Sequence, residues 1–460
     1  MNIINKKPNL LEKSLLLACI LGGVSAPVFN VSADDTIIYP STIMPNFTEL
    51  NTEQQTLGFL RFEVEYMIKA MPLTTERLKQ VAQYFNANDD DKARAALDSA
   101  AITQEQTTLL SQLPQQPQLQ AKLDDLATEL ILLASLTEID TTLGKQRIAK
   151  ASEYFEQALK SGRTPERLYE YARFLQRNNK SEQAEPFLVE AVALLRKQAT
   201  SDPNLLPNLI PLLDELGSIK QAKPSQAAEA YSLYVDALSI NRRFLAKHPE
   251  SVSSFPVLFS SLSELVQVDA SYTSKVEALY KEVINDLRPL VNSAPEVLPT
   301  LAQLLNSQSV MITQNNTTHR QAEIEELYKE ALEIYRKLAT TKPDDYLSYV
   351  SMMLGNLGFL ISSDKTRKEE AEKLLLEALS ISRQLSATHP DAYIRNVFQK
   401  MDVIRLLDGL GRVHMKWNEP QKARAYLQEA SDLIQPLVKT QPEQYKEQAK
   451  NIQEALAQFN

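Results

Sequence analysis

The sequence contains an internal repeat with a period near 47 residues. Six similar segments each close on a proline, and successive closing prolines lie 46 to 52 residues apart. An array of similar units is a better account of this pattern than one core, which a chain of 460 residues would in any case exceed. The closing prolines are Pro203, Pro249, Pro295, Pro343, Pro390 and Pro442.

Each unit repeats small or apolar residues at 19 and 12 positions before its proline, with a Leu or Tyr between them. This spacing places all three residues on one face of a helix, where small side chains let a neighbouring helix come close. Five of the six units also carry an arginine seven residues before the proline. The first small or apolar residues are Ala184, Ala230, Val276, Ile324, Ala371 and Ala423, and the arginines are Arg196, Arg242, Arg288, Arg336 and Arg383.

The closing proline divides each unit into two helices. Proline is tolerated only in the first turn of a helix, so it ends one helix and begins the next. A further apolar segment follows it, as in residues 346–360. Since a single helix hairpin cannot bury its apolar face, neighbouring hairpins must stack. The sequence therefore predicts an all-α solenoid of antiparallel helix pairs.

The last unit resembles the tetratricopeptide repeat (TPR) family. It matches the family's pattern of apolar residues, a Leu-Gly pair and signature alanines at Leu407, Leu410, Gly411, His414, Ala423, Leu427 and Ala430, with His414 where an aromatic is usual. The unit built on Leu168, Tyr171, Ala172 and Ala184 also fits. The resemblance covers residues 146–445 and implies a right-handed superhelical solenoid whose first helices line a concave, peptide-binding face.

The length of the unit departs from the TPR family. The closing proline falls twelve residues after the last signature alanine, against five in the family. The second helix is therefore expected to run about two turns longer. HEAT-type repeats, with periods of about 40–47 residues, are the rival architecture. The alanine and aromatic spacing favours the TPR interpretation.

The remaining regions are less regular. Residues 34–145 are predicted to be a helical N-terminal region with helices at 56–70, 75–85, 92–100 and 122–137, and one divergent TPR-like hairpin is a candidate within it. Residues 114–120 are expected to form a turn. Residues 446–460 are expected to cap the array with a polar outer face.

The first 33 residues have the features of a secretory signal peptide. Lysines precede an apolar stretch, and small residues at −3 and −1 place a cleavage site after Ala33. We therefore expect an exported, most simply periplasmic, protein, with secretion as one alternative and a lipoprotein anchored through Cys19 as another. No later stretch has the length and apolarity of a membrane span.

The composition argues against several functional classes. A net charge of −9 with scattered basic residues is unlike a nucleic-acid-binding surface. Only 10 glycines and no glycine-rich phosphate loop argue against nucleotide binding. The four histidines lack metal-ligand spacing, and residues 86–97 lack the Gly and Glu of a calcium loop. The sequence predicts no catalytic residue, no metal and no cofactor.

The remaining candidate is a partner-binding face on the first helices. Basic residues there are suited to binding carboxylates of a protein or peptide partner, although they also suit a solvated helix face. The middle units offer other side chains, so the predicted face is mixed. The candidate residues are Arg167, Arg173, Arg177, Met352, Phe359, Arg405, Arg412 and Lys416.

We interpret the chain as an exported TPR-like scaffold or adaptor of the bacterial cell envelope that binds protein segments. One alternative is a fixed structural component of an envelope complex. Another is an enzyme, or a regulator of one, with its active part in residues 34–145, a region without Cys or His. The partner's identity and the oligomeric state are left open.

Overall fold

A computed structural model describes residues 52–245, 249–314, 318–388 and 393–459. These residues form helices and turns, with no strand among them. The chain divides into two compact units. Unit 1 is formed by Leu50–Ala246 with Glu264–Ala270, and unit 2 by Lys247–Ser263 with Ser271–Asn460. The predicted signal peptide and Cys19 lie outside the described residues.

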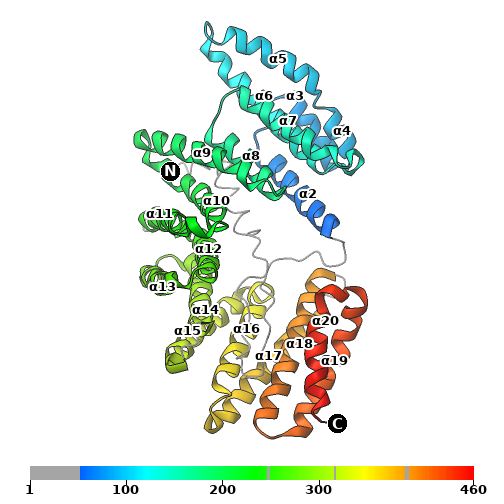
Figure 1. Cartoon of the computed structure of the whole chain (residues 1–460), viewed down its shortest axis with the longest axis vertical. Helices are drawn as coiled ribbons and strands as arrows, with labels where there is room; N and C mark the ends of the chain where they lie inside the picture. Colours follow the sequence, from blue (N-terminus) through cyan, green and yellow to red (C-terminus); the bar gives the residue numbers. More distant parts are fainter. Residues whose placement is uncertain (1–51, 246–248, 315–317, 389–392, 460) are drawn as a thin grey trace. The chain divides into compact units, whose positions relative to one another are not determined.

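Unit 1 begins with a helical bundle and continues into helix pairs (Figure 1). The bundle is stabilised by one apolar cluster drawn from α2 to α7, with Leu78, Leu123 and Leu130 fully buried. Thr75 caps α3 by accepting a hydrogen bond from the Leu78 amide, which fixes where that helix starts. The helices are α2 (Thr52–Ala70), α3 (Glu76–Asn86), α4 (Asp90–Ala95), α5 (Ser99–Gln112), α6 (Gln120–Glu138), α7 (Gln146–Lys160), α8 (Pro165–Arg177), α9 (Ser181–Ser201), α10 (Leu209–Gln221) and α11 (Ala227–Leu245).

The helix predicted at 92–100 is wrong. The structure instead breaks the chain between α4 and α5, because the Asp98 side chain accepts hydrogen bonds from the amides of Ala100 and Ala101 and so starts a new helix. The whole of α5 beyond residue 100 was missed. At the end of the predicted helix, Leu97 is buried and Ala100 is exposed.

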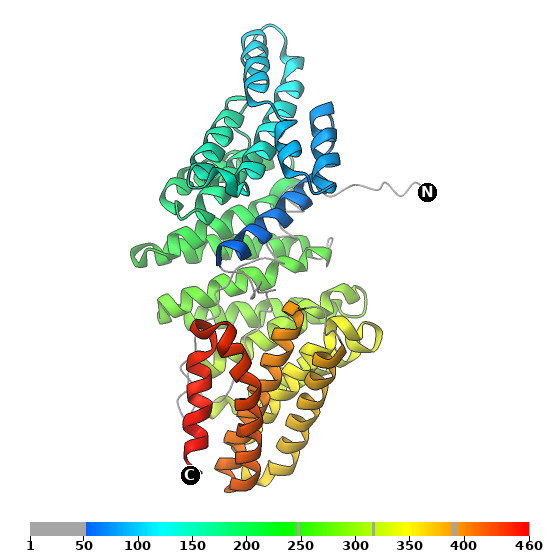
Figure 2. The ribbon, with the colours of Figure 1, turned by 90° about the vertical axis from the view of Figure 1, so that its right-hand side faces the viewer.

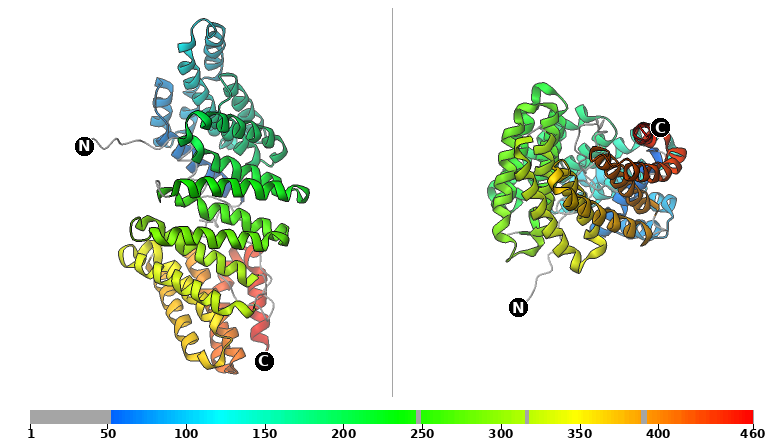
Figure 3. Two further views of the ribbon diagram at one scale, coloured as in Figure 1. Left: turned by 90° about the vertical axis from the view of Figure 1, so that its left-hand side faces the viewer. Right: turned by 90° about the horizontal axis from the view of Figure 1, so that it is seen from below.

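Unit 2 consists of successive antiparallel helix pairs and a final single helix. The boundary between the units falls within α12 (Phe255–Val268), whose Phe259 stacks on Tyr280 of α13 with ring centroids 4.0 Å apart. Within each unit, pairs follow one another in chain order (Figures 2 and 3). The further helices are α13 (Thr273–Leu287), α14 (Leu298–Gln314), α15 (Gln321–Thr341), α16 (Pro343–Ile361), α17 (Lys368–Thr388), α18 (Tyr393–Lys416), α19 (Pro420–Thr440) and α20 (Pro442–Ala457).

The repeat signature explains the packing inside each pair, and the TPR-like architecture of stacked helix pairs is confirmed. The signature alanines Ala184 and Ala423 are fully buried. A side chain on Gly411 would place its Cβ 2.5 Å from Leu427 Cγ, so glycine is what allows α18 and α19 to come this close. The predicted long second helix is also confirmed, since α15 and α19 each span 21 residues and end just before the next helix begins.

The recurring arginines connect the second helices of neighbouring pairs. Arg336 of α15 forms an ion pair with Glu377 of α17, and Arg383 of α17 forms one with Glu429 of α19. Arg196 of α9 pairs with Asp236 of α11 in the same way. We call these contacts the second-helix ladder. Their side chains are about half exposed, so each pair contributes little stability and mainly matches charge along this layer.

Candidate functional site

The candidate residues lie on three first helices, α8 in unit 1 and α16 and α18 in unit 2. The arginines of α8 form ion pairs with carboxylates from other helices. The Arg173 guanidinium donates to Glu63 of α2 at 2.6 Å, and Arg177 donates to Glu138 of α6 at 2.6 Å while lying 3.5 Å from Glu63. Burial alone would raise the pKa of Glu63, but the charges of Arg173 and Arg177 bring it below its usual value.

A further carboxylate faces the same arginines from α10. Burial raises the pKa of Glu215, and the charge of Arg173 opposes that rise. Arg173 also lies 3.9 Å from Glu170 of its own helix. Together with Glu63 and Glu138, the carboxylates around Arg173 and Arg177 outnumber the guanidiniums. This part of α8 therefore presents no surplus positive charge.

Two predicted binding residues are buried, which corrects that part of the prediction. Arg167 is 8% exposed and donates to Asp124 at 2.6 Å and to the Gly162 carbonyl at 3.0 Å. Phe359 of α16 is 4% exposed, because this end of the helix is buried all round, from Met353 to Ile361. Met352 is half-buried. Neither Arg167 nor Phe359 is presented to a partner in this structure.

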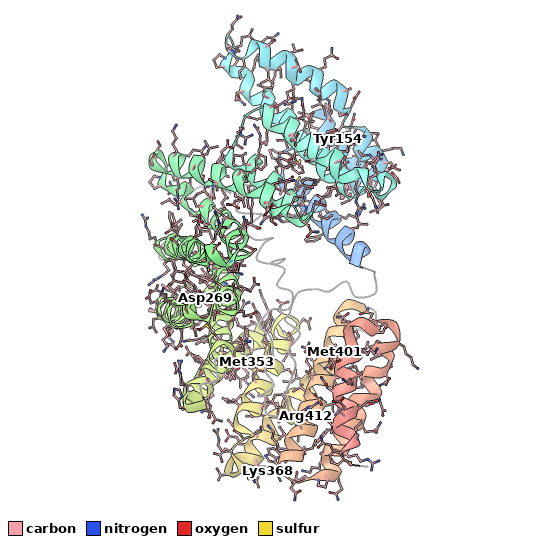
Figure 4. All side chains as sticks on the ribbon, in the orientation of Figure 1. Tyr154, Asp269, Met353, Lys368, Met401 and Arg412 are labelled. Carbon is pink, nitrogen blue, oxygen red and sulfur yellow. The ribbon has the colours of Figure 1, made fainter. Side chains whose placement is uncertain are left out.

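Arg405 and Lys416 of α18 are more accessible than the arginines of α8, whereas the Arg412 side chain is 23% exposed, the same as that of Arg177. The Arg412 side chain donates to Asp408 on its own helix at 3.0 Å and to the Asn451 carbonyl of α20 at 3.2 Å (Figure 4 labels Arg412). The Arg405 side chain is 39% exposed and lies 3.7 Å from Asp402. Lys416 is exposed and has no ion pair within the described part of the chain. We call Arg405, Arg412 and Lys416 the α18 basic face.

The acidic residues beside this face are partly shielded from water, Asp402 less than Asp408. Burial raises the pKa of the Asp402 carboxyl to about 6, against the opposing charge of Arg405. Burial likewise raises the pKa of Asp408, opposed by Arg412. A carboxyl group with a raised pKa becomes protonated at a higher pH. It then no longer neutralises its basic neighbour. The α18 basic face therefore becomes more positive under mildly acidic conditions.

His414 has a structural role at the end of α18. It is fully buried, its Nδ1 lies 2.6 Å from Glu419 Oε2, and its ring stacks on Tyr426 of α19 at a centroid distance of 5.3 Å. Lys368 of α17 hydrogen-bonds to the same Glu419, and these two partners lower the pKa of that carboxyl to about 2. The ring thus fills the aromatic position of the repeat while its Nδ1 is satisfied by Glu419, and its Nε2 lies 3.6 Å from Glu372 Oε1.

Other kinds of site find no support in the described residues. These residues contain no group of three or more His, Cys, Asp or Glu side chains placed to hold a metal ion. None of the described helices combines the length and the apolar character that crossing a membrane requires.

No protein-family model matches the chain, and no curated protein matches it. Among solved structures, BtubC (BKLC) from P. vanneervenii is similar over 56% of this chain and 91% of its own, with 21% identity and a TM-score of 0.41. The APC/C Cut9–Hcn1 hetero-tetramer matches over 90% and 87%, with 14% identity and a TM-score of 0.20. The TPR domain of P58(IPK) matches over 84% and 98%, with 14% identity and a TM-score of 0.16. The assignment of the fold rests on the helix pairing of the chain itself.

Proposed function

We propose that this protein is an exported, TPR-like scaffold of the bacterial cell envelope that binds segments of other proteins on its first helices. A solenoid of helix pairs offers a long surface rather than a closed pocket, which suits protein binding. The α18 basic face is the observation that carries the proposal. Arg405 and Lys416 are accessible, and among the described residues the charges of this face meet only acidic residues of their own helix and a backbone carbonyl.

The second-helix layer is the poorer candidate for binding. Arg336 and Arg383 already meet carboxylates of the next pair there. A partner docking on that layer would have to compete with these ion pairs. On α18, by contrast, Lys416 is exposed and carries a charge that a partner's carboxylate can match directly.

Charge reversal tests the binding face. A photo-crosslinking residue on the first-helix layer would be used in cells producing the wild type or the triple variant R405E/R412E/K416E. The control R288E/R336E/R383E makes the same charge change on the second-helix layer. We expect a discrete crosslinked partner with the wild type and the control, and its loss in the α18 variant. Loss in the control with retention in the α18 variant would move the site to the other layer.

Export is supported by residues 1–33 and is tested separately. Fractionation of cells and N-terminal sequencing of the product should give a periplasmic chain that begins at Asp34. A lipid-modified chain beginning at Cys19 would establish the lipoprotein alternative. An unprocessed chain in the cytoplasm would refute export without affecting the binding proposal.

A fixed component of an envelope complex is the second candidate. Such a protein depends on its partner for stability, whereas an adaptor folds alone. Purified wild-type protein that unfolds cooperatively as a monomer supports the adaptor. Aggregation that is relieved by co-expression with the crosslinked partner would support the fixed component.

A further inference from the structure

The α8 and α18 helices carry basic residues at equivalent places in the repeat. Arg173 and Arg412 each lie 11 residues before the first signature alanine of their unit, Ala184 and Ala423. Arg177 and Lys416 each lie seven residues before it. Spacings of this kind place each pair on one stripe of its helix. The two helices therefore offer the same pair of positive charges.

On α8 these charges are bound by a helix that lies outside the repeat pattern. The residues of α2 that are buried include Leu60, Glu63, Val64 and Ile68, which recur with helical spacing and form one face. Within this face Glu63 alone is charged, and its carboxylate meets both Arg173 and Arg177. The chain thus contains its own example of an amphipathic helix that binds these positions through one acidic residue, Glu63.

On α18 the equivalent charges have no such helix within the described residues of unit 2. Arg412 meets Asp408 of its own helix and a carbonyl of α20, where Arg173 meets Glu63 of another helix, and Lys416 has no ion pair there. Arg405 extends the stripe by seven residues, so the three charges span 11 residues, or about 16 Å along the axis. Burial raises the pKa of Tyr445 on α20, and the charge of the nearby Arg405 opposes that rise.

We infer that the α18 basic face docks an amphipathic helix of a partner protein, with a carboxylate of that helix placed on Arg412 and Lys416 as Glu63 is placed on Arg173 and Arg177. This inference rests on the proposed function and specifies its partner. Lys416 is exposed and the Arg412 side chain is 23% exposed, so both remain open to a partner's carboxylate, and the geometry of Arg favours two-pronged contact. A helix about three turns long spans the distance from Arg405 to Lys416.

The chain supplies a probe for this site. A fluorescent peptide with the sequence of residues 52–70 presents the helix that unit 1 already binds, and its anisotropy reports binding to the full-length protein. We expect binding to the wild type, and a loss of at least about tenfold in affinity when the peptide carries Glu63→Gln. Reversal of Arg412 and Lys416 in the protein should cause a similar loss.

The controls separate the outcomes. Glu65→Gln in the peptide is the matched control, since Glu65 pairs only with the exposed Lys69 of the same helix in this structure. Binding that resists R412E/K416E but disappears with R173E/R177E would overturn the inference, because the peptide would then be exchanging with α2. An unstructured acidic peptide that binds equally well would also overturn it. Loss of the in-cell partner in the α18 variant, with no helix bound in vitro, would leave the scaffold proposal standing and reject the helical ligand.

Discussion

The α8 and α18 helices share a repeat position and differ in what surrounds it. On α8, carboxylates of α2, α6 and α10 surround Arg173 and Arg177, and the guanidinium of Arg173 is largely buried. On α18, Arg412 meets Asp408 of its own helix and a backbone carbonyl. The same sequence signal therefore gives ion pairs to other helices in one unit and, in the other, an ion pair within the helix beside an exposed lysine. The position of a residue in the repeat determines its place on the helix, and the neighbouring helices determine which contacts its side chain makes.

The largest expected effect on stability comes from removing the arginine of each helix in turn. Arg173→Met should lower the free energy of unfolding by about 3 kcal/mol, because it leaves the buried carboxylates Glu63 and Glu215 without this cationic partner. Arg412→Met should cost less, about 1.5 kcal/mol, because only one largely buried carboxylate, Asp408, loses its partner. Urea denaturation of both variants measures the difference. Equal losses would mean that both arginines serve the same structural purpose.

The next effect concerns the glycine that precedes Arg412. Gly411→Ala should destabilise unit 2 by about 2 kcal/mol, since its Cβ would overlap Leu427. The matching residue of unit 1 is the buried Ala172, so Ala172→Gly should cost about 1.5 kcal/mol, through the lost methyl group and the lower helix propensity. Thermal unfolding of the two variants gives the comparison. A neutral Gly411→Ala variant would show that α18 and α19 separate readily.

The pH dependence of stability should differ in sign between the two helices. The folded-state pKa of Asp402 is raised to about 6, so its contribution to stability increases as the pH falls from 7 through 6 toward its unfolded value. Its side chain is 35% exposed, and water screening limits this gain to about 1 kcal/mol. Asp402→Asn should abolish the gain and stabilise the protein at pH 7. Urea midpoints at pH 7 and pH 5 measure both.

Glu63 of the α8 cluster should behave in the opposite way. Its pKa is lowered in the folded protein, so its stabilising charge is present at pH 5 and is lost only as the pH falls through that lowered value. Glu63→Gln should therefore reduce stability at both pH 7 and pH 5. A variant that is destabilised at pH 7 alone would contradict the ion-pair account.

The smallest effect belongs to the second-helix ladder. A double-mutant cycle on Arg336 and Glu377 should give a coupling of about 0.5 kcal/mol, which high salt weakens, because both side chains are about half exposed. The measurement is the free energy of unfolding of the single and double variants at two salt concentrations. A coupling above about 2 kcal/mol would mean that this layer holds the pairs together.

The second-helix ladder has a signal in the sequence that the repeat pattern alone does not explain. An acidic residue recurs six positions before each arginine position, as Asp236 does before Arg242 and Glu377 before Arg383. In the structure, the acidic residue of one pair meets the arginine of the pair before it. The repeating signal was present in the sequence. Only the pairing of neighbouring units was needed to interpret it.

The sequence by itself determined the helix pairs, the closing prolines and the buried signature alanines, because these features repeat at local spacings set by helix geometry. It did not determine the fate of Arg173 and Arg177, because their partners Glu63 and Glu138 lie 110 and 39 residues away in the chain. It also misplaced Phe359, which packs inward. Charge neutralisation across such separations depends on which helices meet in space, and only the tertiary structure decided that.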